Sequence, residues 1–290
     1  MATWNADKPA VGNQVSADIP DIEENFQELH DVITAITNGT LGTTTAANFQ
    51  VDSVSTPAIW LERARFEYKD ADEIYIHAGA YHHVGTVSQV VYWSSKLTSD
   101  IGTPSASDWY YLYIDDSAVV TLGTNLLTTD QLLWSNTEPS WSETKHGWYS
   151  GEDKCIFAVL TDGSGNITEF FHNGDNVWFA DQVTVRANAV VATDWSDEIT
   201  LSMPVFARRA SVTFFWVYVD TVTGLLWRTE GQTGTTGHFA CVPIDADVTQ
   251  LLSTKTVLAS SNLKIDIKEQ AASDNTCYVY QHNWYFPTGV

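Results

Sequence analysis

One narrow apolar stripe near the N-terminus most strongly constrains how this chain can fold. Residues 18–38 have the pattern of a helix, with Asp18 expected as the N-cap, Pro20 in the first turn and Gly39 just past the end. Its apolar residues recur at alternating steps of three and four: Ile19, Ile22, Phe26, Leu29, Ile33 and Ile36. This spacing predicts an a/d heptad seam, and a helix of about five turns is marginal in water unless its seam packs on a partner.

Two partners for this seam are open. The seam can pack on the chain's own β core, or on the same seam of identical copies around a parallel axis, and we favour the second. Isoleucine occupies both a and d positions, a choice that favours three strands over two. The sequence therefore predicts a trimeric coiled-coil helix over residues 18–38, with the six apolar residues as its trimerisation contacts.

The segments on either side of this helix show no periodicity. Residues 1–17 are expected to be extended chain, with Trp4 as a bulky anchor and Pro9 as a turn residue. Residues 39–58 are small and polar, and they are richer in β-branched threonine than a flexible Gly/Ser linker. We expect this connector to run extended along the surface of a neighbour.

From Ile59 onward the pattern is that of β-strands separated by turn signals. The expected strands are Arg63–Tyr68, Glu73–His77, Val87–Trp93, Trp109–Ile114, Gln131–Trp134, Cys155–Leu160, Asn166–Phe171, Gln182–Ala192, Ser211–Asp220, Leu263–Lys268 and Thr276–Phe286. Ser211–Asp220 is apolar on both faces, which predicts cover on both sides, whereas Leu263–Lys268 alternates, which predicts one face in water. No helical period is found after residue 38.

These patterns together predict a mainly β fold. A short N-terminal trimeric coiled-coil helix is followed by two β-sandwich (jelly-roll-like) domains, at residues 59–180 and 181–290. The 290 residues suit two domains of ordinary size, and a hydrophobic content of 44% supports a substantial core.

Charge and cysteine usage exclude several classes of protein. The 14 Lys+Arg against 36 Asp+Glu leave a net charge of −22, the wrong sign for a protein that binds a phosphate backbone. No apolar run reaches the roughly 20 residues that span a bilayer, and the start has no secretory-signal pattern, so we expect synthesis in a cytoplasm. Cys155, Cys241 and Cys277 are odd in number and far apart, which predicts buried free thiols.

Residues that can carry catalytic or metal chemistry are present without a recognisable motif. His77, His82 and His83 are close in sequence, but a strand period does not place His77 and His82 on one face, so a loop or edge role is favoured over a metal site. A metal site shared between subunits on a symmetry axis remains open.

Carboxylates occur in three groups that a glycosidase pair could use. They are Asp115 with Asp116, Asp70 with Asp72 and Glu73, and Asp194 with Asp197 and Glu198. Such a pair is defined by its separation in space, and we expect solvated turns. Asp162–Asn166 predicts a hairpin turn rather than a calcium loop. We therefore expect no enzyme, no cofactor and no metal.

Aromatic residues are the remaining signal, since the chain has 12 each of Trp, Tyr and Phe. Most are expected in the core, but several lie in loop-rich stretches next to Asn, Asp and His. Flat rings of this kind can stack on sugar faces or serve protein interfaces. The candidate glycan-binding residues are Trp134, Trp141, Trp148, Tyr149 and Trp284.

The run Trp4–Asn13, followed by Ser16–Leu29 with its "I-x-x-N-F-x-x-L" helix, resembles the opening of many bacteriophage tail-fibre and virion-attached proteins. In those proteins a tryptophan and a Pro/Gly turn precede such a helix. The middle of the chain is similar to phage fibre-like sequences more loosely, through Trp109–Ile114 and Gly163–Ile167 before Phe170.

This resemblance implies a virion structural protein, commonly a homotrimer, that docks on the particle by its N-terminus, here through Trp4 and Pro9. Its β domains would contact host cell-surface polysaccharide. The implied partners are the chain itself, other tail, neck or portal-region proteins, and that polysaccharide, with no nucleic acid and no membrane insertion. The absence of a long repetitive shaft favours a short tail or neck fibre. Two alternatives stay open: a tailspike-like polysaccharide depolymerase or deacetylase, and an architectural connector without a ligand.

Overall fold

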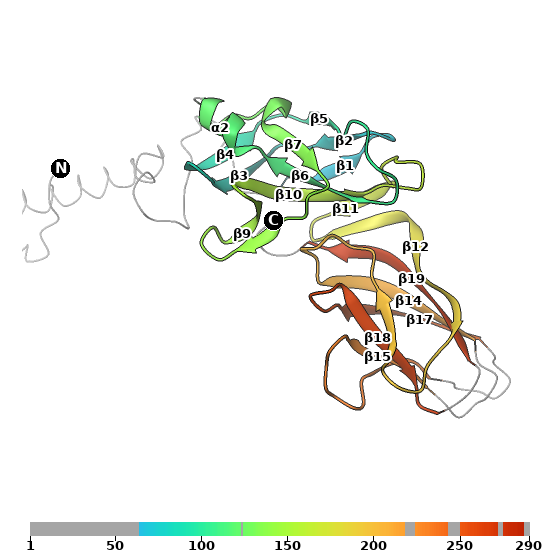
Figure 1. Ribbon diagram of the computed structural model, residues 1–290. Helices are drawn as coiled ribbons and strands as arrows, with labels where there is room; N and C mark the ends of the chain where they lie inside the picture. The colour runs from blue at the N-terminus through green and yellow to red at the C-terminus, as the bar shows by residue number, and fades with distance from the viewer. Residues whose placement is uncertain (1–63, 123, 218–223, 243–249, 272–274, 287–290) are drawn as a thin grey trace, which may run out of the picture. The chain divides into compact units, whose positions relative to one another are not determined.

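The computed structural model describes residues 64–286 apart from 123, 218–223, 243–249 and 272–274 (Figure 1). By its internal contacts the chain divides into two units, residues 1–63 with Gly79–His82, and Ala64–Ala78 with His83–Val290. Of the first unit only Gly79–His82 is described, as the start of strand β3 (Gly79–Val84). The predicted anchor, coiled-coil helix and connector, including Trp4, Pro9 and the six heptad residues, lie outside the described residues.

The second unit consists mainly of antiparallel β-sheets, which confirms the mainly β prediction. Its largest sheet has eight strands in the order β17-β14-β19-β12-β11-β1-β2-β5. These strands are β1 (Phe66–Tyr68), β2 (Glu73–Ile76), β5 (Leu97–Asp100), β11 (Phe170–Asn173), β12 (Asn176–Val190), β14 (Arg209–Val217), β17 (Gln250–Leu258) and β19 (Thr276–Tyr285). One sheet thus contains strands from both expected β domains, and the expected boundary at residues 180/181 lies inside β12.

Two further sheets belong to this unit, in the orders β7-β6-β10-β9-β8 and β13-β18-β15-β16. Their strands are β6 (Trp109–Ile114), β7 (Leu132–Ser135), β8 (Ser140–Ser142), β9 (Gly147–Ser150), β10 (Asp153–Leu160), β13 (Asp197–Thr200), β15 (Leu225–Thr229), β16 (His238–Cys241) and β18 (Lys264–Glu269). Strand β4 (Ser88–Trp93), helix α2 (Asp116–Leu122) and the short 3-10 helix η1 (Thr129–Gln131) are the other described elements of this unit. None of the described helices has the length and apolarity that crossing a membrane requires.

The core is aromatic and is shared by strands far apart in the sequence. Phe66 of β1 stacks on Phe157 of β10, with ring centroids 4.0 Å apart and planes at 10°. Trp284 of β19 lies against the same Phe157 at 6.1 Å, and Phe206 contacts Trp284 at 5.7 Å. Because all four rings are almost fully buried, the eight-stranded and five-stranded sheets have one continuous core.

The β14 strand confirms the prediction of cover on both faces. Val212 and Phe214 on one face are fully buried, and Ser211 and Thr213 on the other face are only 7% exposed. Trp216 on the first face donates from Nε1 to Glu269 Oε1 of β18 at 3.3 Å, which links the sheet to the four-stranded sheet.

Two local predictions are wrong. Residues 116–122 form a helix, which is too short for its period to be visible in the sequence. Strand β18 does not have one face in water, because Asp266 is buried and accepts from Arg228 Nε at 2.9 Å. Asp162–Asn166 is the predicted hairpin turn: Asp162 N donates to Asn166 O at 2.7 Å, and Thr161 and Ile167 form an antiparallel bridge before the chain passes from β10 to β11.

Candidate functional site

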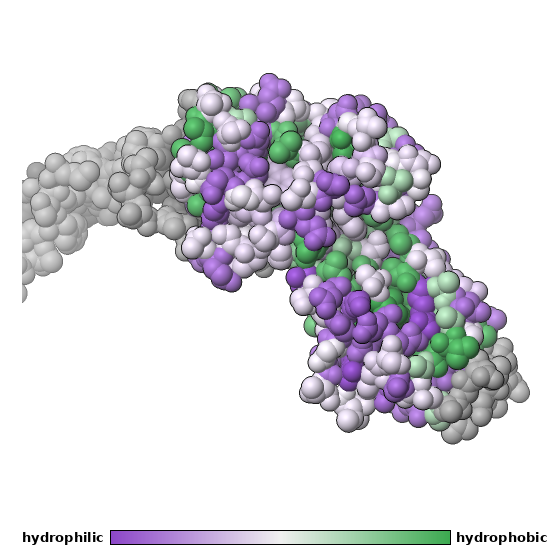
Figure 2. Space-filling model, in the orientation of Figure 1, coloured by the Kyte–Doolittle hydropathy of each residue, from purple (hydrophilic) through white to green (hydrophobic). Residues whose placement is uncertain are grey.

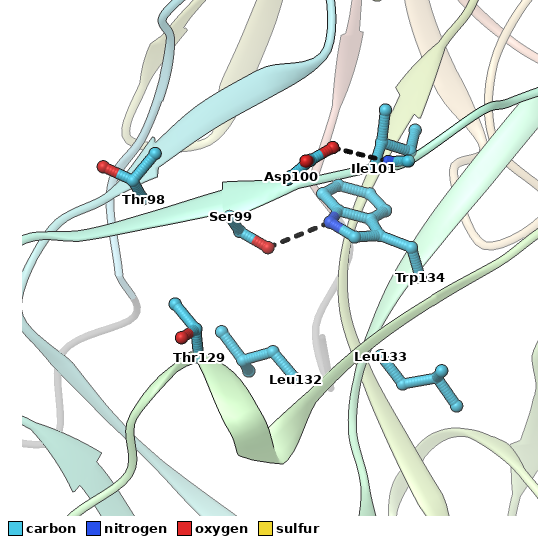
Figure 3. A pocket seen from close by; sticks show the side chains of 9 residues that line it. Thr98, Ser99, Asp100, Ile101, Thr129, Leu132, Leu133 and Trp134 are labelled. Carbon is cyan, nitrogen blue, oxygen red and sulfur yellow. Dashed lines mark hydrogen bonds between the residues drawn. The ribbon is translucent and has the colours of Figure 1, made fainter.

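An open pocket of about 410 Å³ lies between two sheet edges (Figure 3). Strand β5 is an end strand of the eight-stranded sheet, and β7 is an end strand of the five-stranded sheet. The pocket is lined by β5 and the turn after it, and by η1 and β7: Thr98, Ser99, Asp100, Ile101, Gly102, Thr129, Leu132, Leu133 and Trp134. One predicted glycan-binding residue, Trp134, is therefore part of a hollow.

Local interactions position the pocket walls. The Trp134 indole N–H donates to Ser99 Oγ at 3.0 Å, so the ring is held across the gap between the two strands (Figure 3). Asp100 Oδ1 accepts from Gly102 N at 2.6 Å, and Gly102 adopts a φ of 79°, a conformation that favours glycine. These contacts fix the positions of β5 and of the turn after it beside the indole ring.

The opposite wall depends on a capped 3-10 turn. Thr128 N donates to Gln131 Oε1 at 2.9 Å, and the Thr128 side chain accepts from Asp130 N, which makes a capping box around η1. This turn places Thr129 and Leu132 at the pocket. The pocket therefore combines one ring and aliphatic side chains with hydroxyls and a carboxylate.

This combination suits a ligand that has both apolar faces and hydroxyl groups. A half-buried indole offers a stacking surface, and Thr98, Thr129 and Asp100 offer hydrogen-bonding groups at the rim. Among the lining residues, all of them described, there is no histidine, cysteine, lysine or arginine. The polar groups of the lining are therefore neutral hydroxyls and one carboxylate.

Trp141 and Trp148 are brought together at the other end of the five-stranded sheet. They are paired across β8 and β9, with ring centroids 5.8 Å apart in an edge-to-face arrangement. Trp141 is exposed, whereas Trp148 also contacts the buried Phe206 at 6.1 Å. Strands β6, β10 and β9 separate β8 from β7, so this pair does not share the Trp134 pocket.

Tyr149 and Trp284 are core residues, with exposures of 2% and 1%. Their rings have no free face for a sugar, so the expectation that they bind glycan finds no surface in the structure. Tyr149 OH accepts from Val84 N at 3.2 Å, and burial raises the pKa of Tyr149 to about 12. The sequence placed these rings beside loops, but strand pairing turns both inward.

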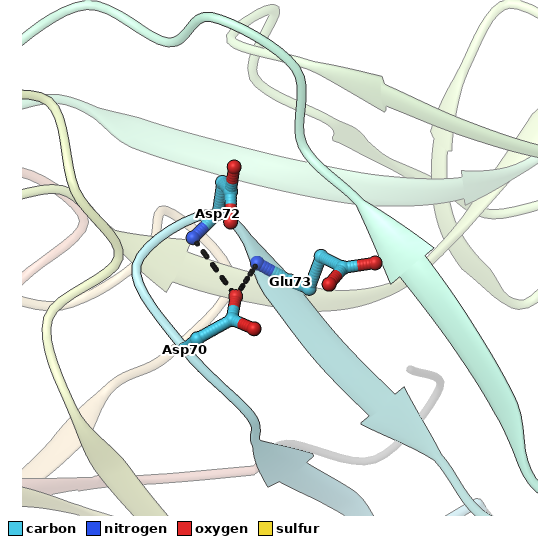
Figure 4. Close-up of side chains that lie close together, drawn as sticks. All are labelled: Asp70, Asp72 and Glu73. Carbon is cyan, nitrogen blue, oxygen red and sulfur yellow. Dashed lines mark hydrogen bonds between the residues drawn. The ribbon is translucent and has the colours of Figure 1, made fainter.

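Asp70, Asp72 and Glu73 form the one group of three potential metal ligands among the described residues, with oxygens within 4.8 Å of one another (Figure 4). Asp70 Oδ1 accepts from the backbone N of Glu73 at 3.0 Å and of Asp72 at 3.4 Å, so it closes the turn before β2. Lys69 already forms ion pairs with Asp70 and Glu73. A hydrogen bond with Asp70 raises the pKa of Asp72. This group is therefore the solvated turn that was expected, and Lys69 offsets part of its negative charge.

His83 does not have the loop or edge role expected for the histidine cluster. It is fully buried, and its Nε2 lies 2.9 Å from Asp116 Oδ1. Thr86 donates to the same carboxylate from its backbone N at 2.9 Å and from Oγ1 at 2.6 Å. Asp116 N in turn donates to Asp153 Oδ1 at 2.9 Å. This network anchors the start of α2.

The other predicted carboxylate groups have structural partners. Asp115 caps α2, since its Oδ1 accepts from Ser117 N at 2.9 Å. Asp197 pairs with Arg186, and Glu198 pairs with Lys264 at 2.5 Å. None of these acids is among the residues that line the Trp134 pocket.

The three cysteines are free and buried, which confirms that prediction. Burial raises the pKa of each thiol, to about 12 for Cys241. They therefore pack as small apolar side chains.

One pair of exposed aromatic residues on neighbouring strands was not identified from the sequence. Phe171 and Trp178, directly paired on β11 and β12, are 59% and 41% exposed. The alternation of buried Phe170, Val177 and Phe179 with these two positions was the available signal. On the face that Figure 2 shows, hydrophilic and neutral residues are interspersed with patches of apolar residues.

No family model matches this chain, and no curated protein matches it. Among solved structures, the chain is similar to the Bacillus thuringiensis insecticidal crystal protein Cry7Ca1, at 12% identity and a TM-score of 0.22. That match covers 78% of this chain and 51% of the other, so the chain spans about half the length of that protein. A likeness this weak carries no argument about fold or function.

Proposed function

We propose that this chain is a virion-attached fibre protein of a bacteriophage that contacts a host cell-surface glycan. The Trp134 pocket is the observation that carries the binding role, because an indole face, hydroxyls and one carboxylate converge on a hollow of about 410 Å³. The resemblance of residues 4–29 to the opening of phage fibre proteins supports the virion role. Docking on the particle is assigned to the N-terminal segment, with Trp4 and Pro9.

The assembly part of the proposal is a homotrimer. Residues 18–38 form the coiled coil through their heptad seam, and the following strands belong to jelly-roll-like sandwiches. Trp134, Trp141 and Trp148 remain candidate glycan-binding residues, since each keeps some ring surface exposed. A net charge of −22 helps to keep many copies dispersed, at the cost of repulsion within a trimer.

Glycan binding is tested by native affinity electrophoresis of the full chain. The gels contain O-polysaccharide, capsule or teichoic acid preparations from a panel of bacteria. We expect at least one preparation to retard the chain, and Trp134→Ala to abolish that retardation while Trp195→Ala does not. Trp195 is a matched control because it is half-buried on another part of the unit. Failure of every preparation would reject the glycan role, and release of reducing ends or acetate would favour the tailspike alternative.

Assembly is tested by multi-angle light scattering of the full chain at micromolar concentration. We expect a trimer, and we expect Ile22→Asp with Ile33→Asp to dissociate it, because buried carboxylates in the seam are not paired. Glu23→Gln with Glu28→Gln is the control, since these positions lie off the seam. A monomeric full chain would reject the assembly proposal.

A further inference from the structure

One residue of the pocket lining, Thr98, belongs to a row of side chains across the outer face of the eight-stranded sheet, while its neighbour Ser99 holds Trp134 on the opposite side of β5 (Figure 3). Register pairs Thr98 of β5 with Tyr75 of β2, and Tyr75 with Glu67 of β1. Glu67 is paired with Phe171 of β11, and Phe171 with Trp178 of β12. Residues paired in this way share one face of a sheet, so these five side chains form a single row that begins at a pocket residue.

The row faces away from the core. Its neighbours along the strands, Phe66, Ile74, Phe170 and Val177, are all buried on the opposite face. Thr98, Phe171 and Trp178 are exposed, and Tyr75 and Glu67 are half-buried. Five strands at about 4.8 Å spacing give the row a length of about 19 Å, longer than a single sugar ring.

The chemistry of the row alternates along its length. The aromatic pair Phe171 and Trp178 stands at one end, and Thr98, on the edge strand that also lines the Trp134 pocket, stands at the other. Between them Glu67 accepts hydrogen bonds, with His77 Nε2 at 2.6 Å from its Oε2. Lys96 Nζ lies 3.6 Å from the centroid of the Tyr75 ring and brings an ammonium donor to the same stretch.

This arrangement favours a sugar chain over a protein surface as the occupant. The centre of a protein interface is depleted in charged residues, whereas the centre of this row holds Glu67, with the Arg65 guanidinium 3.4 Å away. Sugar hydroxyls can hydrogen-bond these groups without leaving them unpaired, and the exposed rings of Phe171 and Trp178 can stack on sugar faces.

Resting on the proposed function, we propose that the glycan is bound as a chain of several sugars that passes round the edge strand β5, with one part in the Trp134 pocket and another on Phe171 and Trp178. The row from Thr98 to Trp178 is then an extended binding surface. The ligand class is a linear oligosaccharide or polysaccharide, and a single terminal sugar would use only the pocket.

The test uses the full chain and the preparation that retards it in affinity gels. Phe171→Ser and Trp178→Ser should each weaken retardation about tenfold, the equivalent of 1.4 kcal/mol. Phe171→Tyr and Trp178→Phe should restore it, since they keep a ring. Phe239→Ser is the matched control, because Phe239 is 52% exposed on β16, away from the row. Thermal unfolding of each variant checks that the fold is kept.

Chain length gives a second readout. Fragments of the retarding polysaccharide, sorted by size after mild acid hydrolysis, should compete better as they lengthen, and the advantage of long fragments should vanish in Phe171→Ser. Retardation that depends on Trp134 but not on Phe171, Trp178 or fragment length would overturn this inference and leave the proposed function standing. A preparation panel without any retardation would overturn both. A change of oligomeric state in Phe171→Ser, with retardation intact, would instead identify an interface between copies.

Discussion

His83 and Asp116 form a buried pair, with imidazole Nε2 2.9 Å from carboxylate Oδ1. The histidine is fully buried and the aspartate is 6% exposed. Because Thr86 also donates twice to this carboxylate, Asp116 joins the segment after β3 to the first turn of α2.

Replacing Asp116 should therefore be costly. Asp116→Ala leaves His83 Nε2 and the Thr86 N–H without an acceptor, and we expect the free energy of unfolding to fall by about 3 kcal/mol. Urea denaturation measures this change. Glu143→Ala is the control, since Glu143 is exposed, and it should change stability by less than about 0.5 kcal/mol. Equal stability of the two variants would contradict the assigned role of the pair.

The same carboxylate should make stability depend on acid pH. Burial alone would raise the pKa of Asp116, but hydrogen bonds from Thr86 and His83 outweigh burial and lower it. A lowered folded-state pKa stabilises the fold above the unfolded value of 3.8, and this stabilisation is lost as pH falls through the folded pKa. The stability gap between the native chain and Asp116→Asn should thus be full at pH 7 and shrink below about pH 4. A gap that widens in acid would contradict this sign.

The bond between Trp134 and Ser99 should control the pocket. Ser99→Ala removes the acceptor of the indole N–H, and we expect a loss of about 1 kcal/mol of stability together with weaker glycan retardation. Ser94→Ala, at an exposed position outside the pocket lining, leaves the indole bond in place and serves as the comparison. If the polysaccharide retards Ser99→Ala as strongly as the native chain, binding does not depend on the orientation of the indole.

The three thiols should resist modification in the folded protein. Burial raises the pKa of all three, so thiolate is scarce near neutral pH, and each sulfur is shielded from reagent. A chromogenic disulfide reagent should detect none of them at pH 8 in native buffer and all three in guanidinium chloride. Rapid reaction of even one thiol in native buffer would show that a buried segment opens readily.

A comparison of alanine variants at Gly237 and Gly151 distinguishes backbone strain from steric conflict. Both have positive φ, 59° and 63°, but an added Cβ at Gly237 would lie 2.4 Å from the Trp195 ring, whereas at Gly151 it would meet nothing within 4 Å. Gly151→Ala should cost about 1 kcal/mol from the backbone alone, and Gly237→Ala should cost clearly more. Thermal unfolding of both variants measures the difference. Equal losses of stability would mean that the Trp195 ring moves aside without an energetic penalty.

Local pattern was sufficient for several elements of the fold. Trp109–Ile114 was predicted as a strand and is β6, and the apolar run from Ser211 was predicted to be covered and is buried through Phe214. The free, buried state of the cysteines also followed from their number and spacing. These properties depend on side-chain polarity and on the alternation of strand residues, which can be observed within a few consecutive positions.

Only the tertiary structure determined which aromatic rings lie at the surface and which lie in the core. Tyr149 and Trp284 looked like Trp134 in the sequence, yet packing against other sheets buries the first two and leaves Trp134 at a sheet edge. Likewise, Phe171 and Trp178 became neighbours of Glu67 and Tyr75 only through the order β12-β11-β1-β2. These contacts depend on pairing between strands that are distant in the chain. The free energy of such pairing depends on the whole sheet, so it cannot be inferred from a short stretch of sequence.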